Sequence, residues 1–232
     1  MKIEIWSDIA CPWCYVGKRR FESALAQFEH RDAVEVVWRS FELDPSAART
    51  YDRSQAELLA EKYRVPVSQA EQMNARMTDA ARNEGLEFNF EISRPGNTFD
   101  AHRLIHLAAS VGRREAVVER FFAGYLGEGA AIGDANALFT LAVEAGLEPD
   151  LVRSVLDSDM YGDAVRADEA QARSLGISGV PFFAIDGKYG VSGAQPAEVL
   201  LGAMTQAYAE SAPMVMGAGT EADRCTDGSC AV

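Results

Sequence analysis

The sequence predicts an α/β fold in which strand-containing segments at both ends of the chain enclose a long helical stretch. Residues 1–41 alternate strand, helix and strand patterns, residues 54–156 are dominated by helical spacing, and residues 163–208 combine two helices with a hairpin. These assignments rest on apolar residues that recur with a period of two in strands and about 3.6 in helices. With 232 residues, of which 48% are hydrophobic, the chain can bury a substantial core.

The N-terminal segment predicts a strand followed at once by a helix. In residues 1–7 the apolar Ile3 and Ile5 alternate with charged residues, which is the period of a strand. Apolar residues at helical spacing follow from Pro12, and proline suits the first helical turn because its missing N–H is not needed there. Cys11 is therefore expected at or next to the N-cap.

Cys11 and Cys14 form a Cys-X-X-Cys motif at this join between strand and helix. The Cys11 sulfur is expected to face unpaired backbone N–H groups and the positive end of the helix dipole, surroundings that favour thiolate over thiol. We therefore expect Cys11 to attack a disulfide and the more shielded Cys14 to resolve the mixed disulfide. Two core cysteines, or half of a zinc site, are the alternatives.

The remaining core elements follow from the same reasoning. Val34–Phe41 reads as a strand that completes a βαβ unit, after which a polar stretch leaves the sheet. Near the other end, a helix over Asp163–Leu175 precedes strands at Phe182–Ile185 and Tyr189–Ser192, and Asp186-Gly187 between them is a strong hairpin signal because tight turns require positive φ. A last helix is expected over Ala197–Tyr208.

Capping and stop residues predict six helices in the middle of the chain. Ser54 and Ser68 are expected to cap the first two, and Thr98 or Asn97 the third. The expected ranges are Ser54–Arg64, Ser68–Asn83, Thr98–Val111, Glu115–Leu126, Ala135–Ala145 and Asp150–Leu156.

Several motifs resemble those of a known family. C-P-W-C after an N-terminal strand, with G-V-P-F-F at 179–183, resembles the DsbA-like branch of the thioredoxin superfamily. W-S-D-I-A-C-P-W-C-Y-V-G at 6–17, W-R-S-F-E-L at 38–43 and N-T-F-D-A-H-R-L at 97–104 resemble the FrnE-type group within it. The resemblance implies a thioredoxin-like fold (DsbA-like) with an inserted all-helical lobe, and thiol–disulfide exchange as the chemistry. The expected parts are a discontinuous core of residues 1–50 and 163–210, a helical insertion of residues 51–162 and a flexible tail of residues 211–232.

Pro181 is a second expected element of the site. Thioredoxin-like proteins place a cis proline beside the Cys-X-X-Cys motif. The resemblance therefore implies a cis Val180–Pro181 bond, where the sequence alone would favour trans. The resulting kink would leave the backbone of Val180 free to hydrogen-bond a substrate chain as an added strand.

Three further residues are expected near a substrate. Trp13 offers a flat apolar surface between the two cysteines, and the resemblance implies roles facing the active site for Asn97 and His102. His102 and His106 are spaced so that one helix face could present two metal ligands. No glutamate follows His102 and no third ligand is evident, so we expect packing or a hydrogen bond to the core there, and no metal.

The C-terminal segment carries a second cysteine pair, Cys225 and Cys230, in C-T-D-G-S-C. The Asp-Gly turn would bring these thiols together, so a disulfide is feasible. The resemblance supports a second redox pair that exchanges with Cys11 and Cys14, because some FrnE-type proteins carry such a tail. Idle thiols, or a four-thiolate zinc site with the first pair, are the alternatives.

Net charge and hydropathy restrict the classes of partner and the cellular compartment that we expect for this protein. A formal net charge of −13 argues against binding to nucleic acid or an anionic membrane. A charged and then apolar leader does not precede the first strand, and no long apolar run follows, so we expect a cytoplasmic protein. In that compartment four cysteines indicate catalysis, redox sensing or metal binding more than structural disulfides.

The expected function is a thiol–disulfide oxidoreductase without a cofactor. Its partners would be protein or small-molecule thiols and disulfides, glutathione among them. One alternative is a glutathione-dependent isomerase or transferase acting on a small aromatic molecule, since isomerases of the hydroxychromene-carboxylate type resemble the same scaffold, although they usually show Ser where Cys11 stands. A zinc-holding or chaperone-type binding protein is the alternative from another class.

Overall fold

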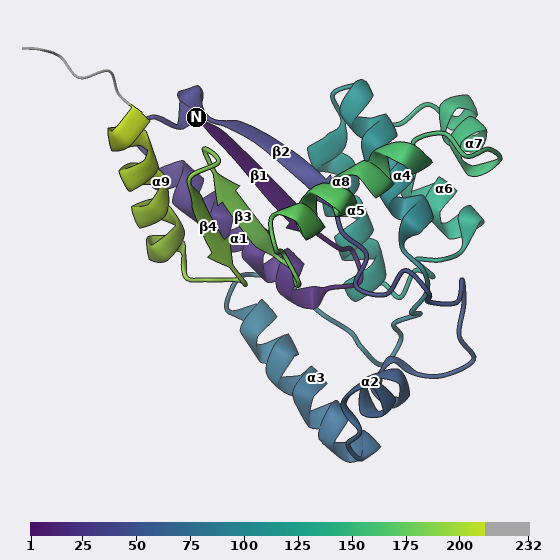
Figure 1. Ribbon diagram of the computed structural model, residues 1–232. Coiled ribbons are helices and arrows are strands. Elements are labelled where there is room, and N and C mark those ends of the chain that lie inside the picture. The colour runs from purple at the N-terminus through teal and green to yellow at the C-terminus, as the bar shows by residue number, and fades with distance from the viewer. Residues whose placement is uncertain (212–232) are drawn as a thin grey trace, which may run out of the picture.

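The computed structural model describes residues 1–211, which form a four-stranded mixed sheet with helices on both faces (Figure 1). The strands lie in the order β2-β1-β3-β4. β1 runs parallel to β2 and antiparallel to β3, and β3 is antiparallel to β4. Their bounds are β1 Lys2–Ser7, β2 Glu35–Ser40, β3 Phe182–Ile185 and β4 Tyr189–Ser192. The predicted α/β fold is confirmed.

Nine α-helices lie within residues 1–211, and none of them is both long and apolar enough to cross a membrane. Six of them, α2 to α7, lie between β2 and α8 in the sequence, and α2 and α3 pack on each other and project from the body (Figure 1). The division into core and insertion at the expected boundaries stays a prediction. The bounds are α1 Pro12–Gln27, α2 Gln55–Tyr63, α3 Val67–Arg82, α4 Phe99–Ser110, α5 Arg114–Leu126, α6 Ala135–Glu144, α7 Pro149–Leu156, α8 Gly162–Ser174 and α9 Ala197–Ser211, with a 3-10 turn at Arg31–Ala33.

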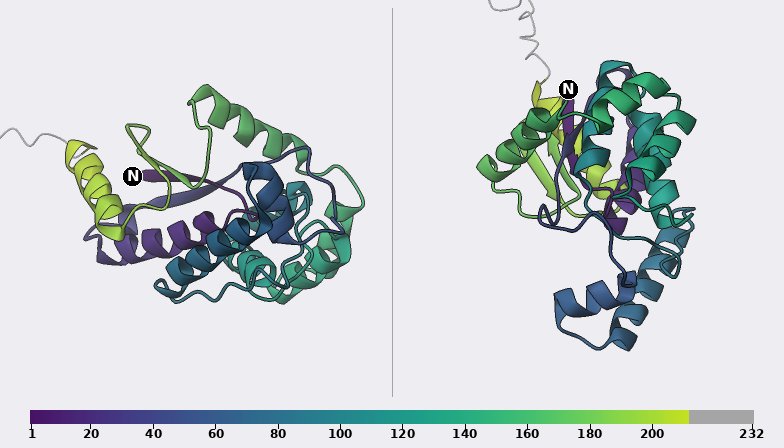
Figure 2. Two further views of the ribbon diagram at one scale, coloured as in Figure 1. Left: turned by 90° about the horizontal axis from the view of Figure 1, so that it is seen from below. Right: turned by 90° about the vertical axis from the view of Figure 1, so that its right-hand side faces the viewer.

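Both faces of β1 contribute apolar side chains to the interior of the protein. Ile3 and Ile5 point into the main core, where α1 and α9 pack. Trp6 lies on the other face in a smaller apolar cluster with Ala172 of α8. Figure 2 shows α8 on one side of the sheet and α1 on the other. Both faces of the sheet are covered, so apolar side chains are buried on both faces of β1.

Packing of α1 on the sheet depends on its apolar stripe. Phe21 is 3% exposed, and its ring centroid lies 5.7 Å from that of Phe183 in β3. Complete burial of such a side chain contributes about 1.5–3 kcal/mol. The hairpin between β3 and β4 forms as predicted, with positive φ at Asp186 (53°) and Gly187 (66°).

Capping is predicted correctly at α2 and incorrectly at α3. Ser54 and Glu57 form a reciprocal capping box at the start of α2. α3 begins at Val67 with Pro66 as its N-cap, because Pro66 already has the extended conformation that the position requires (φ −60°, ψ 149°), so Ser68 lies inside the first turn. At α4 the side chain of Thr98 makes no capping bond.

Candidate active site

Cys11 occupies the N-cap of α1 as predicted, with extended backbone (φ −94°, ψ 109°) and Pro12 as the first helical residue. The Cys11 N–H donates to the carbonyl of Asp8 (3.0 Å), and the Cys14 N–H donates to the carbonyl of Cys11 (3.0 Å). The turn after β1 therefore positions both cysteines through the backbone. Both are free thiols among the described residues, whereas Cys225 and Cys230 lie outside them.

The Cys11 sulfur makes a contact that differs from the predicted one. It forms no capping hydrogen bond to the N–H groups of α1, and lies 3.6 Å from the carbonyl oxygen of Val180, to which the thiol donates. A thiol is a donor as well as a weak acceptor, and the Val180 carbonyl lies before β3, outside the strand pairing. The Val180–Pro181 peptide bond is cis, as the resemblance implies.

Gly17 permits the close approach of Pro181 to α1. A Cβ atom at Gly17 would lie 2.8 Å from Cγ of Pro181, well inside van der Waals contact. Because Gly17 stands one turn after Cys14, a side chain there would push the Val180–Pro181 segment away from the two thiols.

Cys14 is more shielded than Cys11, as predicted, with exposed fractions of 1% and 6%. Burial raises the pKa of Cys14 well above its ordinary value, and Cys11 raises it further through a hydrogen bond and its charge. The Asp8 backbone and the Ser7 hydroxyl act in the opposite direction but do not outweigh burial. In this geometry Cys14 keeps its proton while Cys11 is reduced.

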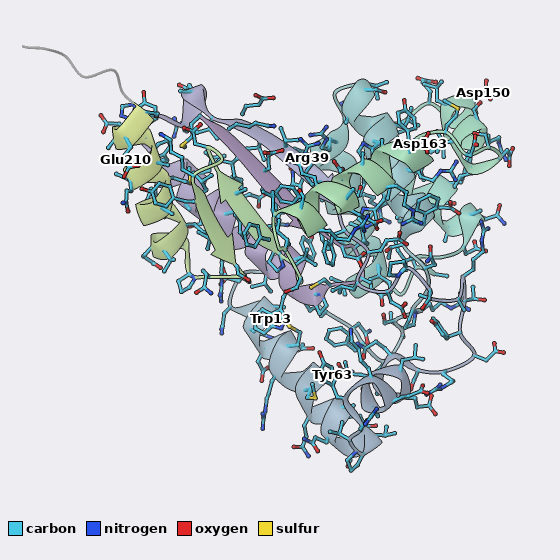
Figure 3. The ribbon with its side chains drawn as sticks, viewed as in Figure 1. Trp13, Arg39, Tyr63, Asp150, Asp163 and Glu210 are labelled. Carbon is cyan, nitrogen blue, oxygen red and sulfur yellow. The ribbon has the colours of Figure 1, made fainter. Side chains whose placement is uncertain are left out.

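Trp13 contrasts with both cysteines because its side chain is 45% exposed. It lies at the start of α1, on the side of the molecule from which α3 projects (Figure 3). An exposed indole beside two reactive sulfurs offers an apolar contact surface. Its contact with substrate stays a prediction.

Asn97 makes hydrogen bonds to the start of α4 and to a buried carboxylate. Its Oδ1 accepts the Phe99 N–H (2.9 Å), so Asn97, one of the two expected caps, satisfies the start of the helix. Its Nδ2 donates to Oε1 of Glu42 (3.3 Å). Its hydrogen bonds to described residues do not include Cys11 or Cys14, so its expected role at the active site stays a prediction.

The two histidines of α4 face different carboxylates. Nε2 of His102, a residue only 2% exposed, lies 3.4 Å from Oδ1 of Asp8. Nε2 of His106 lies 3.1 Å from Oδ2 of Asp168 and 3.2 Å from the Ser40 hydroxyl. Within residues 1–211, no group of three or more His, Cys, Asp or Glu side chains is arranged to hold a metal ion.

Ser7 and Asp8 are the residues near the thiols to which sequence reasoning assigned no role. Asp8 is 1% exposed and accepts the N–H groups of Ala10 (3.2 Å) and Leu43 (2.7 Å). It thereby ties the turn after β1 to the segment after β2. A charged residue directly after a buried strand and three residues before Cys11 was the available signal.

A family comparison agrees with this arrangement. The model of the DSBA-like thioredoxin domain matches residues 2–205. The chain belongs to this family. Within it, the described residues place two thiols at a helix N-terminus and include a cis proline, and the narrower FrnE-type assignment stays a prediction.

Individual relatives extend the family comparison. A crystal structure of a probable DsbA oxidoreductase from Streptomyces coelicolor is 48% identical, with a TM-score of 0.88 over 100% of this chain and 99% of that one. The uncharacterized protein YwbO of Bacillus subtilis (strain 168) is 31% identical over 188 residues, 79% of this chain and 86% of its own. A 2-hydroxychromene-2-carboxylate isomerase is 18% identical, with a TM-score of 0.65 over 90% of this chain and 97% of that one, and shares the fold.

Proposed function

We propose that this family member exchanges disulfides through Cys11 as the nucleophile and Cys14 as the resolving thiol. The Cys11 thiolate attacks one sulfur of a substrate disulfide, and the other substrate sulfur leaves with the electron pair of the broken bond. Cys14 then attacks the Cys11 sulfur, which releases the second substrate thiolate and leaves a Cys11–Cys14 disulfide. Two electrons pass to the substrate, and the reverse sequence oxidises a dithiol.

The observation that carries this proposal is the asymmetry between the two thiols. Cys14 is almost fully buried, and Cys11 is among the causes of its raised pKa. Once Cys11 is bonded to substrate sulfur it no longer carries a negative charge, so its effect on Cys14 disappears. Cys14 thus becomes easier to deprotonate at the stage when it must attack.

Substrate contacts would come from Trp13 and from the backbone of Val180. The exposed indole provides apolar area, and the Val180 carbonyl, which accepts from the Cys11 thiol, is available to an extended chain once that thiol has reacted. Pro181 carries no N–H that would compete for the sulfurs. Proteins and small thiols such as glutathione remain the proposed partners, and a cytoplasmic location stays a prediction.

Serine variants of the two cysteines test the proposal. Cys11→Ser is expected to lower disulfide reduction at least about 1,000-fold, because no nucleophile replaces the thiolate. Cys14→Ser is expected to accumulate a mixed disulfide on Cys11, visible as a mass adduct that dithiothreitol removes. Unchanged turnover in Cys11→Ser would refute the proposal. Turnover of a small aromatic substrate that survives in Cys14→Ala with glutathione would favour the isomerase instead.

A further inference from the structure

A small cavity lies beside the redox motif, between the end of β1, the end of β2 and α4. Its volume is about 10 Å³, room for a single water molecule. Its polar wall includes Ser7, Ser40 and His102, and Ile9 and Ile105 contribute apolar wall. The cavity therefore lies between Ser7 at the end of β1 and the buried His102 of α4.

Two buried polar atoms belong to residues that line this cavity and make no hydrogen bond within the described residues: Oγ of Ser7 and Nε2 of His102. His102 Nε2 is 3.4 Å from Oδ1 of Asp8 but is not aligned to bond it, and that oxygen already accepts the Ala10 N–H. A buried polar group without a partner costs free energy, and one water between these two atoms would satisfy both.

Ser7 also connects the cavity to Cys14. The side chains of both residues are buried, and the Ser7 hydroxyl, which has no hydrogen-bond partner among the described residues, acts to lower the pKa of Cys14 against the larger effect of burial. The proposed path therefore starts at the Cys14 sulfur and continues to Ser7. From Ser7 it crosses the cavity to His102, a buried base.

We propose that Ser7 and His102, through one water in this cavity, remove the proton that Cys14 loses when it resolves the mixed disulfide; the inference rests on the proposed function. The Cys14 proton passes to the Ser7 oxygen, the Ser7 proton to the water, and a water proton to Nε2 of His102. The Cys14 sulfur bonds to the Cys11 sulfur, and the substrate sulfur leaves with the electron pair of its broken bond. Asp8 faces the imidazolium that forms.

Charges on the surrounding elements suit a proton acceptor at His102. Asp8 in the turn after β1 and Glu42 after β2 supply negative charge, and Arg39 of β2 lines the same cavity. Arg39 is engaged by Glu4 and Asp168, so its charge is largely compensated. On α8, Arg166 and Glu169 pair with each other, and Arg166 also pairs with Glu42.

The test separates the two steps of exchange with 5,5′-dithiobis(2-nitrobenzoate), which releases one coloured thiolate when Cys11 attacks and a second when Cys14 resolves. The full-length reduced protein is used with Cys225 and Cys230 changed to serine, so that only two thiols react. His102→Gln is expected to slow the second release about 10- to 100-fold near neutral pH and to leave the first within about twofold. Ser7→Ala is expected to have the same pattern with a smaller effect.

His106→Gln is the matched control, because His106 lies one turn further along α4, bonds Asp168 and does not line the cavity. It is expected to change neither release. The pH profile distinguishes a relay from a structural role: in His102→Gln the second release should rise with pH through the alkaline range, as solvent takes over deprotonation of Cys14. If His102→Gln does not fold, Ser7→Ala decides the same question.

A second release within twofold of the parent, with an unchanged pH profile, would overturn the relay while leaving the proposed function intact. A first release at the parental rate in Cys11→Ser would instead overturn the proposed function. Equal slowing of both releases by His102→Gln would show that His102 acts through the structure of the site, and would also overturn the relay.

Discussion

Two polar clusters lie near the same end of the sheet and differ in how many of their buried polar atoms have hydrogen-bond partners. The redox cluster consists of Ser7, Asp8, Cys11, Cys14 and His102, and the anchoring cluster consists of Glu4, Arg39, Ser40, His106 and Asp168. In the anchoring cluster both carboxylate oxygens of Asp168 are occupied, Oδ1 by Arg39 (2.9 Å) and Oδ2 by the Ser40 N–H (3.0 Å) and His106 (3.1 Å). In the redox cluster Ser7 Oγ and His102 Nε2 have no hydrogen-bond partner among the described residues.

The difference separates a structural role from a chemical one. Burial alone would raise the pKa of Asp168, but bonds from His106, the Ser40 N–H and Arg39 outweigh it and hold the pKa below its ordinary value. Asp168 therefore stays charged and joins α8 to β2 and α4. A buried group that must exchange a proton with a reacting sulfur needs an open position instead, and His102 has one.

The largest expected effect on stability is that of Asp168→Asn, which breaks the anchoring cluster. Removing one partner of this buried set should lower the free energy of unfolding by about 3 kcal/mol, because Arg39 and His106 lose their carboxylate. Urea denaturation measures this loss. The two releases of coloured thiolate should keep their rates in the folded fraction. A loss of less than about 1 kcal/mol would mean that the anchoring cluster is not structural.

A smaller and opposite pattern is expected for Gly17→Ala, which disturbs the Val180–Pro181 segment beside the redox cluster and leaves the anchoring cluster intact. The added methyl group would meet Pro181, so the first release should slow about threefold to tenfold. Stability should change by no more than about 1 kcal/mol, because the better helix propensity of alanine offsets the strain. Stopped-flow absorbance and urea denaturation measure the two quantities. An unchanged first release would show that the Val180–Pro181 segment need not lie close to the thiols.

A smaller change is expected in Cys11→Ser, where Cys14 should react faster with an alkylating reagent. Cys11 contributes to the raised pKa of Cys14, so its removal lowers that pKa, although burial, the largest cause, keeps it above the ordinary value. The rate of reaction of Cys14 with iodoacetamide at pH 8 to 9 should therefore rise several-fold relative to the parent protein. Mass spectrometry after digestion identifies the alkylated cysteine. A slower reaction would contradict the described coupling of the two thiols.

The smallest effect is on acid stability. Since the folded protein holds the pKa of Asp168 below its ordinary value of about 3.9, its contribution is fully present above that pH and is lost as the pH falls through the lowered pKa. Below about pH 4 the free energy of unfolding should thus fall less steeply in Asp168→Asn than in the parent. Glu119, whose pKa is lowered to about 2, contributes equally to both proteins. Parallel curves would assign the acid sensitivity to other carboxylates.

Local sequence patterns correctly predict the strands, the helix start and the turn that surround the site. Three features depend only on neighbours a few residues away, and the structure confirms each of them: the alternation of Ile3 and Ile5, the proline after Cys11 and the Asp186-Gly187 turn. The resemblance added the cis bond before Pro181, which periodicity does not reveal. The predicted start of α3 at Ser68 is wrong, because the extended backbone of Pro66 lets that residue occupy the N-cap.

Contacts between distant side chains depend on how the elements pack and cannot be predicted from local patterns. Spacing on α4 cannot tell that His102 faces Asp8 while His106 faces Asp168, because that choice follows from how α4 packs against the strand ends and α8. The contact of the Cys11 sulfur with the Val180 carbonyl is likewise a product of sheet register. Periodicity identifies which face of an element is buried, and packing selects the partner that the buried face meets.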